Sequence, residues 1–344
     1  MAQINKPNEY FNTKLYTGNG TSQSVTGVGF QPDLIWVKER SSTSSHQLVD
    51  AVRGVYRRLI PNGTNAESDD SGSPNDFNSF DSDGFSILAG GAVNENSQTY
   101  AAWNWLAGGT GVSNTDGSIT STVSVNTTSG FSIVSYTGTG ANATVGHGLG
   151  VAPKMIIVKS RSGVFNWGVY HESIGNTKYL ELNETTATQT SSTLWQNTTP
   201  TSSFFSLGSN NTVNQSSGTY IAYCFAEKKG FSKFGSYVGN GSADGTFIYT
   251  GFKPAMVIFK NASTVTNWGI VDNKRDDDNV VKARLFPNLS DTEASNLDIC
   301  DFTSNGFKLR ITDSQFNGSG NTMIYMAFAE NPLVGTNNIP ATAR

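Results

Sequence analysis

One phrase occurs three times in this chain, and it constrains the fold more than any other feature. Each copy begins with a glycine, has a proline three positions later, continues with a short apolar run and ends near a lysine. The copies occupy residues 29–40, 150–161 and 251–262. The repeating unit is roughly 100 residues long, which is too long for a solenoid repeat and suits one domain.

Other elements recur in the same order around this phrase. A glycine-rich turn precedes each copy, as in "YTGNG" at residues 16–20, and an aromatic-rich strand closes each copy, as in "TYAAWNWLA" at residues 99–107. We therefore predict three domains. Repeat 1 comprises residues 1–108, repeat 2 comprises 109–230 with a linker strand at its start, and repeat 3 comprises 231–344 with a C-terminal arm.

The local patterns predict strands. The apolar run in each phrase is short and rich in β-branched and aromatic residues, which is typical of a buried strand, and the proline stands just before it. Glycine is abundant, at 36 residues, and charged residues are sparse, at 15%. We predict an all-β protein of three tandem β-sandwich domains, of the jelly-roll or lectin-like type. Three lysines end the runs, and we expect them to emerge into solvent: Lys38, Lys159 and Lys260.

Helix signals are weak in this sequence. Thr177–Glu184 and Asp291–Ile299 could each form a turn or a short helix. The segment between repeats 1 and 2, residues 108–130, is polar and contains no aromatic residue. We expect it to be a linker with one strand at Ser118–Val125.

Composition excludes several classes of partner. The net charge is −4 with no basic stripe, so we expect no nucleic acid partner. No run of 18 apolar residues occurs, so we expect no membrane span. The start of the chain is too polar for a signal peptide, and the two cysteines, Cys224 and Cys300, fit no metal spacing. These features indicate a chain made in a reducing cytoplasm with free thiols.

The titratable residues do not form a recognisable catalytic or metal-binding motif. The histidines lack metal-type spacing, and by repeat register His46 corresponds to Trp167 and Trp268, which favours a structural role. Aspartates near glycine, as in "DSDG" at residues 81–84, are first of all turn formers, and a calcium site is the weaker interpretation. No nucleophile elbow or phosphate loop occurs. We expect no enzyme activity, no cofactor and no metal.

Two tryptophans are the candidate binding residues. Trp167 and Trp268 each follow an asparagine at the start of a strand. They are either core residues, which we favour, or a stacking platform for sugars.

The sequence resembles repeat domains in virion proteins of tailed bacteriophages, especially those of marine and cyanobacterial hosts. The likeness lies in "YFNTKLYTGNGTSQSVTGVGFQPDLIWVKERS", "FDSDGF", "TYAAWNWLAGG", "NTDGSITSTVSVNTTSGFSIVSYTGTG" and "VGHGLGVAPKMIIVKSR". It covers most of the chain and is strongest in the first 170 residues or so. Repeat 3 departs most, at residues 272–281 and 285–296. The family is placed among tail-fibre or related tail structural proteins, and it brings no catalytic residues with it.

The resemblance implies a structural virion protein in the tail or on the particle surface. No coiled-coil heptads or shaft repeats occur, so a compact fibre, tip or appendage subunit fits better than a long shaft. We expect a homotrimer that contacts other virion proteins and host surface polysaccharide. The alternatives are a capsid decoration protein and, less favoured, a glycan-binding or glycan-depolymerising protein.

Overall fold

The computed structural model describes residues 3–330. The C-terminal arm predicted after repeat 3, residues 331–344, lies outside this range. The protein is nearly all β, with 40% strand and 7% helix, and its paired strands are antiparallel. The prediction of an all-β fold is therefore confirmed. None of the helices in the described range is long and apolar enough to cross a membrane.

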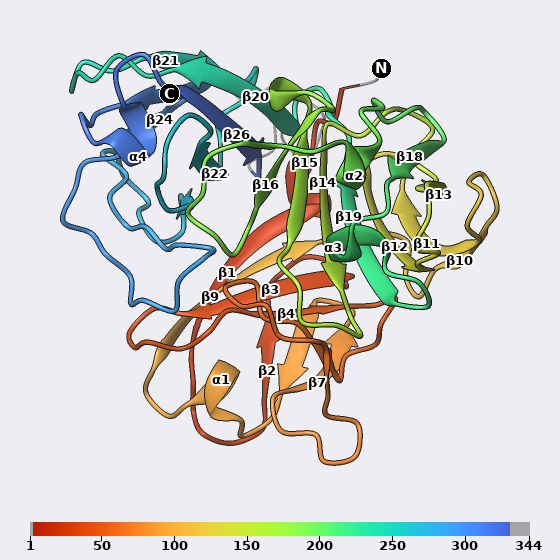
Figure 1. The fold of residues 1–344 in the computed structure, drawn as a ribbon. Helices are drawn as coiled ribbons and strands as arrows, with labels where there is room; N and C mark the ends of the chain where they lie inside the picture. Colours follow the sequence, from red (N-terminus) through yellow and green to blue (C-terminus); the bar gives the residue numbers. More distant parts are fainter. Residues whose placement is uncertain (1–2, 331–344) are drawn as a thin grey trace.

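Each repeat contains a four-stranded array with the same strand order (Figure 1). The opening strand is at one edge, the closing strand is next to it, and the strand of the repeated phrase follows. The array of repeat 1 is β1 (Phe11–Thr17), β9 (Thr99–Trp105), β3 (Leu34–Glu39) and β4 (Gln47–Asp50). The array of repeat 2 is β12 (Phe131–Thr137), β19 (Thr219–Phe225), β14 (Met155–Ser160) and β15 (Gly168–His171). The array of repeat 3 is β20 (Ser232–Val238), β26 (Thr322–Phe328), β22 (Met256–Asn261) and β23 (Gly269–Asp272).

A smaller sheet and a one-turn helix accompany each array. Repeat 1 has β2 (Gln23–Thr26), β8 (Gly84–Ile87), β7 (Phe77–Asp81) and α1 (Gly91–Asn94). Repeat 2 has β13 (Ala143–Gly146), β18 (Phe204–Leu207) and α3 (Asn211–Asn214). Repeat 3 has β21 (Phe247–Tyr249), β25 (Gly306–Leu309), β24 (Cys300–Thr303) and α4 (Ser314–Asn317). A separate apolar cluster in each repeat includes residues of both its sheets.

The remaining elements lie in linkers and loops. Repeat 2 extends its array to eight strands with β10 (Val112–Asn114), β11 (Ser121–Asn126), β16 (Lys178–Glu181) and β17 (Gln189–Thr190). Short elements elsewhere are η1 (Pro7–Glu9), β5 (Arg57–Arg58), β6 (Ser68–Asp69), η2 (Glu172–Ile174) and α2 (Ser192–Trp195).

The local predictions for the linker and the two helix signals had different outcomes. The strand expected in the linker is β11, shifted a few residues toward the C-terminus, and β10 precedes it. The helical alternative for Thr177–Glu184 is wrong because this segment forms β16, which pairs with β15. No helix occurs within Asp291–Ile299.

Two sequence patterns have a direct structural cause. The glycine that begins each phrase has positive φ, at +89° for Gly29, +71° for Gly150 and +84° for Gly251, a conformation that favours glycine. The side chains of the closing strand of repeat 1 alternate between two apolar clusters. Trp103 and Trp105 belong to one apolar cluster, and Tyr100 belongs to the cluster on the opposite face.

The largest apolar cluster is shared by all three repeats. It combines residues from the three four-stranded arrays, and these arrays surround a common centre in Figure 1. Trp105, Phe225 and Phe328 end the three closing strands, and their ring centroids lie 5.7–6.5 Å apart in every pairing. Side chains at equivalent positions therefore meet at one point, which gives the chain an approximate internal three-fold arrangement.

Candidate functional site

The lysines of the repeated phrase are buried, so the expectation that they emerge into solvent is wrong. Lys38, Lys159 and Lys260 are each 0% exposed. The Lys159 ammonium donates hydrogen bonds to the Thr64 carbonyl of repeat 1 at 2.9 Å and to the Phe165 carbonyl at 2.7 Å. Lys260 repeats this pattern one repeat further on, with the Thr185 carbonyl at 3.1 Å. The apolar run, considered as one strand, predicts that its last residue is exposed to solvent. In repeats 2 and 3, a loop of the preceding repeat covers this residue.

Burial lowers the pKa of each of these lysines from 10.5 to about 8. In repeat 1, the charges of Glu39, Asp291 and Glu293 oppose this shift, and the last two belong to repeat 3. Repeat 1 therefore lies against repeat 3, as repeat 2 lies against repeat 1. The contacts run in a closed circle.

The two candidate tryptophans also contact the preceding repeat. Trp167 is 0% exposed and Trp268 is 1% exposed. The Trp167 indole N–H donates to the Ile60 and Gly63 carbonyls at 3.1 Å, and the Trp268 indole N–H donates to the Glu181 carbonyl at 2.9 Å. Neither ring presents a face to solvent, so this structure offers no sugar platform at these residues.

His46 makes the same contact in repeat 1. Its Nδ1 accepts from the Trp36 indole at 2.9 Å, so its Nε2–H donates to the Phe286 carbonyl of repeat 3 at 2.9 Å. Burial lowers the pKa of His46 to about 3, which keeps the ring neutral. The register that matched His46 with two tryptophans thus identified one interface position, which is occupied by histidine in repeat 1 and by tryptophan in repeats 2 and 3. In each repeat the backbone N–H of this residue donates to an asparagine side chain, from Asn62, Asn183 and Asn288 respectively.

A second interface position lies at the end of the next strand. Asp50 accepts a hydrogen bond from the Tyr223 hydroxyl of repeat 2 at 2.7 Å. Asp272 accepts from the Trp103 indole of repeat 1 at 3.1 Å. His171 has its Nδ1 bonded to the Ser173 amide, and its Nε2–H donates to the Tyr325 carbonyl of repeat 3 at 3.2 Å. These contacts form the same closed circle, in the opposite direction.

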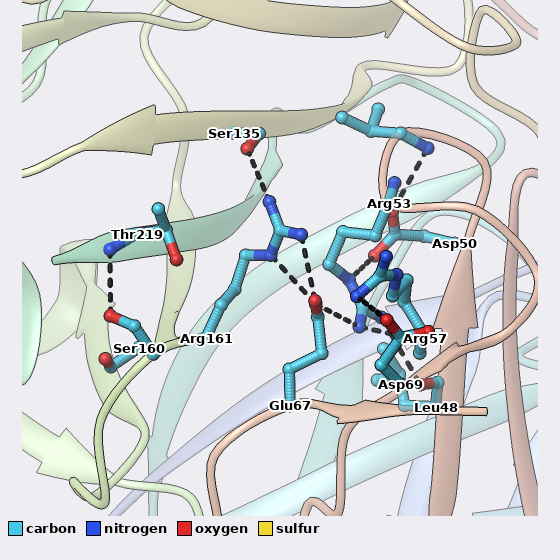
Figure 2. A network of polar contacts seen from close by, with 12 residues as sticks. Leu48, Asp50, Arg53, Arg57, Glu67, Asp69, Ser135, Ser160, Arg161 and Thr219 are labelled. Carbon is cyan, nitrogen blue, oxygen red and sulfur yellow. Dashed lines mark hydrogen bonds and ion pairs between the residues drawn. The ribbon is translucent and has the colours of Figure 1, made fainter. Parts of the chain in front are cut away.

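Two of the three interfaces contain an ion network that is partly buried. Glu67 of repeat 1 accepts from Arg161 of repeat 2 at 2.8 and 2.9 Å and from its own Arg53 at 3.1 Å (Figure 2). Arg53 also donates to Asp50 at 2.6 Å. Burial would raise the pKa of Glu67, but the two guanidinium groups hold it below its ordinary value.

The interface between repeats 3 and 1 has the same network. Glu293 pairs with Arg40 at 2.8 Å and with Arg275 at 3.2 Å, and Arg275 pairs with Asp272 at 2.6 Å. Between repeats 2 and 3, Thr188 takes the place of the glutamate, and its backbone N–H donates to the Ala262 carbonyl at 3.0 Å. In the other two interfaces, the Glu67 backbone N–H donates to the Arg161 carbonyl, and the Glu293 backbone N–H donates to the Arg40 carbonyl. The backbone geometry is therefore common to all three interfaces, whereas the ions are not.

An asparagine present in every repeat was missed by the sequence analysis. It ends the one-turn helix of each repeat and is 0% exposed. The Asn214 amide donates to the Ala141 and Gly208 carbonyls, and its oxygen accepts from the Thr139 N–H. This residue ties the glycine-rich turn to the smaller sheet. The signal was the constant spacing to the threonine that begins the closing strand: Asn94, Asn214 and Asn317 stand before Thr99, Thr219 and Thr322.

His147 and Asp83 have their hydrogen-bond partners within their own repeats. His147 is 0% exposed, and both its ring nitrogens contact backbone groups, the Leu149 N–H and the Thr201 carbonyl. Asp83 lies in the turn that joins β7 to β8, as predicted for "DSDG", and it accepts hydrogen bonds from the N–H groups of Gly27 and Gly29 in another loop. No group of three or more His, Cys, Asp or Glu side chains in residues 3–330 is arranged to hold a metal. Both cysteines are buried and free.

One polar hollow of about 510 Å³ lies on repeat 3. It is lined by charged side chains that include Lys253, Lys274 and Asp276–Asp278. The Asp276 carboxylate is already bonded to the backbone N–H groups of Lys282 and Ala283. The hollow therefore contains no assembled ligand set.

The comparison with protein families supplies one result. The profile described as "Domain of unknown function (DUF7483)" matches residues 6–332, a single span that includes all three repeats. The comparison with curated proteins found no match. Because the matched span covers almost the whole chain, this protein belongs to the DUF7483 family.

Proposed function

We propose that this chain is a structural component of a tailed-phage virion, a compact tail-tip or appendage subunit without catalytic activity. The resemblance to phage tail repeat domains supplies the class of protein. The closed circle of contacts between repeats is the observation that supports a structural role. At the interface positions, the polar residues that recur between repeats bind the neighbouring repeat and are buried.

The shape supports a compact subunit better than a shaft. We interpret each repeat as a β-sandwich module, with the smaller sheet packed on the four-stranded array. A rod requires each module to leave one face free for the next module. Here the contact faces of all three modules are used within one chain, so the circle is closed as in a cyclic trimer. Lengthening would need contacts through other surfaces.

Contact with host glycans would need exposed aromatic rings. Trp167 and Trp268 are buried, but Phe247 and Tyr249 on β21 are 45% and 65% exposed. Alternate residues of a strand point to the same face, so the two rings form one surface. We propose this surface of repeat 3 as the site of glycan contact. We further propose that the chain is made in the host cytoplasm and assembles with other virion proteins, as a homotrimer.

The test is to locate the chain in purified phage particles by mass spectrometry and cryo-EM. Density at the tail, with repeat 3 facing outward, is the expected result. Density spread over the capsid would instead make the chain a decoration protein. A chain missing from the particle would overturn the structural role, and a sugar-release assay would follow.

The glycan contact is tested separately with the purified protein. Binding to polysaccharide extracted from the host surface should fall at least about tenfold in Tyr249→Ala, because the aromatic face on which a sugar ring would stack is lost. Tyr179→Ala, in a half-buried position of repeat 2, serves as the control. Equal binding by both variants would exclude the β21 surface.

A further inference from the structure

The outer edge of β1 in repeat 1 carries no strand in the described structure. β1 pairs with β9 on one side only. In repeat 2 the equivalent strand, β12, pairs with β19 on one side and with β11 on the other. The same strand position therefore accepts a further strand in repeat 2, and in repeat 1 that position is open.

A groove follows this open edge. It has a volume of about 260 Å³ and is lined by Asn12–Leu15, Gly27 and Lys274. By strand register, Asn12–Leu15 correspond to Ser132–Ser135 of β12, the residues that pair with β11. The groove thus occupies the place that β11 fills in repeat 2.

The backbone of β1 directs hydrogen-bonding groups toward the groove. At the two ends of β1, the Leu106 N–H donates to the Tyr10 carbonyl, and the Gly18 N–H donates to the Gln98 carbonyl. Both Leu106 and Gln98 lie beside β9. Because bonded residues alternate along an antiparallel pair, Thr13 and Leu15 direct their backbone groups outward. An open edge of this kind is a ready template for another strand.

The last described residue of the chain lies in this groove. The Glu330 side chain pairs with Lys274 at 2.6 Å, and Glu330 is only 5% exposed. Its carboxylate also lies against the backbone N–H of Thr13. The chain therefore arrives at the open edge of β1, and residues 331–344 follow from that point.

The following segment is long enough to cover the edge. Pro332 and Pro340 enclose seven residues without proline, Leu333–Ile339. As a strand these residues would extend about 23 Å, which exceeds the roughly 13 Å of the four-residue edge. Proline at the ends of a strand is compatible with an edge position.

We propose that Leu333–Ile339 binds along the outer edge of β1 in the same chain and takes the place that β11 has in repeat 2. The segment would cover the opening strand beside which the described part of the chain ends. It would also cover an unpaired strand edge of repeat 1 that could otherwise pair with another chain. The proposal concerns the chain alone and is independent of its location in a particle.

Amide hydrogen exchange by NMR tests the proposal on the full chain and on a variant that ends at Glu330. Protection of the Leu15 amide should be at least about tenfold greater in the full chain, because only there does it have a hydrogen-bond acceptor. The Tyr16 amide faces β9 and should be equally protected in both, which shows that β1 is intact. Equal exchange of Leu15 in the two proteins would overturn the proposal.

A spin label distinguishes a segment of the same chain from that of a second copy. The label is attached at Asn337→Cys, and line broadening is measured at the Leu15 amide, with the Ser135 amide of β12 as the control. Broadening within labelled chains, and none when labelled chains are mixed with isotope-enriched unlabelled chains, is the expected result. Broadening in the mixed sample would assign the groove to a second copy, and no broadening in either sample would leave the groove without this occupant. Both outcomes contradict the proposal.

Discussion

Replacing Lys260 by methionine tests the interface lysines directly. The ammonium donates to the carbonyls of Thr185, Asn261 and Thr266 at 3.1, 2.9 and 2.9 Å. A hydrogen bond from a charged donor contributes about 1.5–3 kcal/mol, so three bonds contribute roughly 4–9 kcal/mol. The pKa of Lys260 falls from 10.5 to about 8, so burial of the charge costs about 3 kcal/mol. Methionine avoids this cost, and the expected net loss is about 3 kcal/mol.

The loss is measured by urea unfolding at pH 7, followed by tryptophan fluorescence. Lys253→Met is the matched control, because Lys253 is in the same repeat and exposed. Its free energy of unfolding should stay within about 0.5 kcal/mol of the unmodified protein. If Lys260→Met is as stable as this control, the contacts with Thr185, Asn261 and Thr266 are not stabilising and the reasoning is refuted.

The lowered pKa of Lys260 also predicts how the free energy of unfolding changes with pH. Its pKa is about 8 in the folded chain and 10.5 when unperturbed. Below pH 8 both states hold the proton, so this residue adds no slope. Above pH 8 the unfolded state binds more protons, so the free energy of unfolding rises with pH through this residue. The rise from pH 8 to 9.5 should be smaller in Lys260→Met, and an identical slope would contradict the lowered pKa.

Three further predictions concern other buried groups. Glu67→Gln should lower the free energy of unfolding at pH 7 by about 3 kcal/mol, because Arg53 and Arg161 lose their shared anion. The lowered pKa of Glu67 stabilises the folded chain at neutral pH, and this stability is lost as the pH falls below 4.5, so the loss should be smaller in Glu67→Gln. The same dependence of the free energy of unfolding on acidic pH in both proteins, measured by urea unfolding, would argue against this. Asn214→Ala should cost about 2–4 kcal/mol, since two buried carbonyls lose their donor, while Asn176→Ala, at a more accessible position, should cost less than about 1 kcal/mol. Cys224 and Cys300 are buried, and burial raises the pKa of both thiols, so iodoacetamide should label them at least about 100-fold more slowly in the native chain than in urea; rapid native labelling would contradict their burial.

The sequence was informative where one repeat could be compared with another. The repeated phrase predicted strands that the structure contains, and the register of His46 with the two tryptophans identified a shared position. What that position contacts could not be predicted, because the partner is a loop of another repeat. The lysine at the end of each apolar run shows the same limit. A strand that ends in lysine normally reaches solvent. For Lys159 and Lys260, a loop of the preceding repeat covers the ammonium and adds a carbonyl oxygen to those of the same repeat.

Local propensity also gave an ambiguous result at one segment. Thr177–Glu184 contains helix-forming residues, yet β16 forms there because β15 offers it a free edge. The ion networks were not predictable either, since Glu67 and Arg161 are far apart in the chain and no repeat carries the complete set. The spacing of Asn94, Asn214 and Asn317 was available in the sequence and would have identified a structural residue.

The central claim is that the three repeats form one interlocked body with a shared core and a closed circle of contacts. Differential scanning calorimetry of the full chain tests it most directly. The account predicts a single unfolding transition whose calorimetric and van't Hoff enthalpies agree. Two or three separable transitions, with a van't Hoff enthalpy well below the calorimetric value, would show that the repeats unfold independently and would contradict the claim.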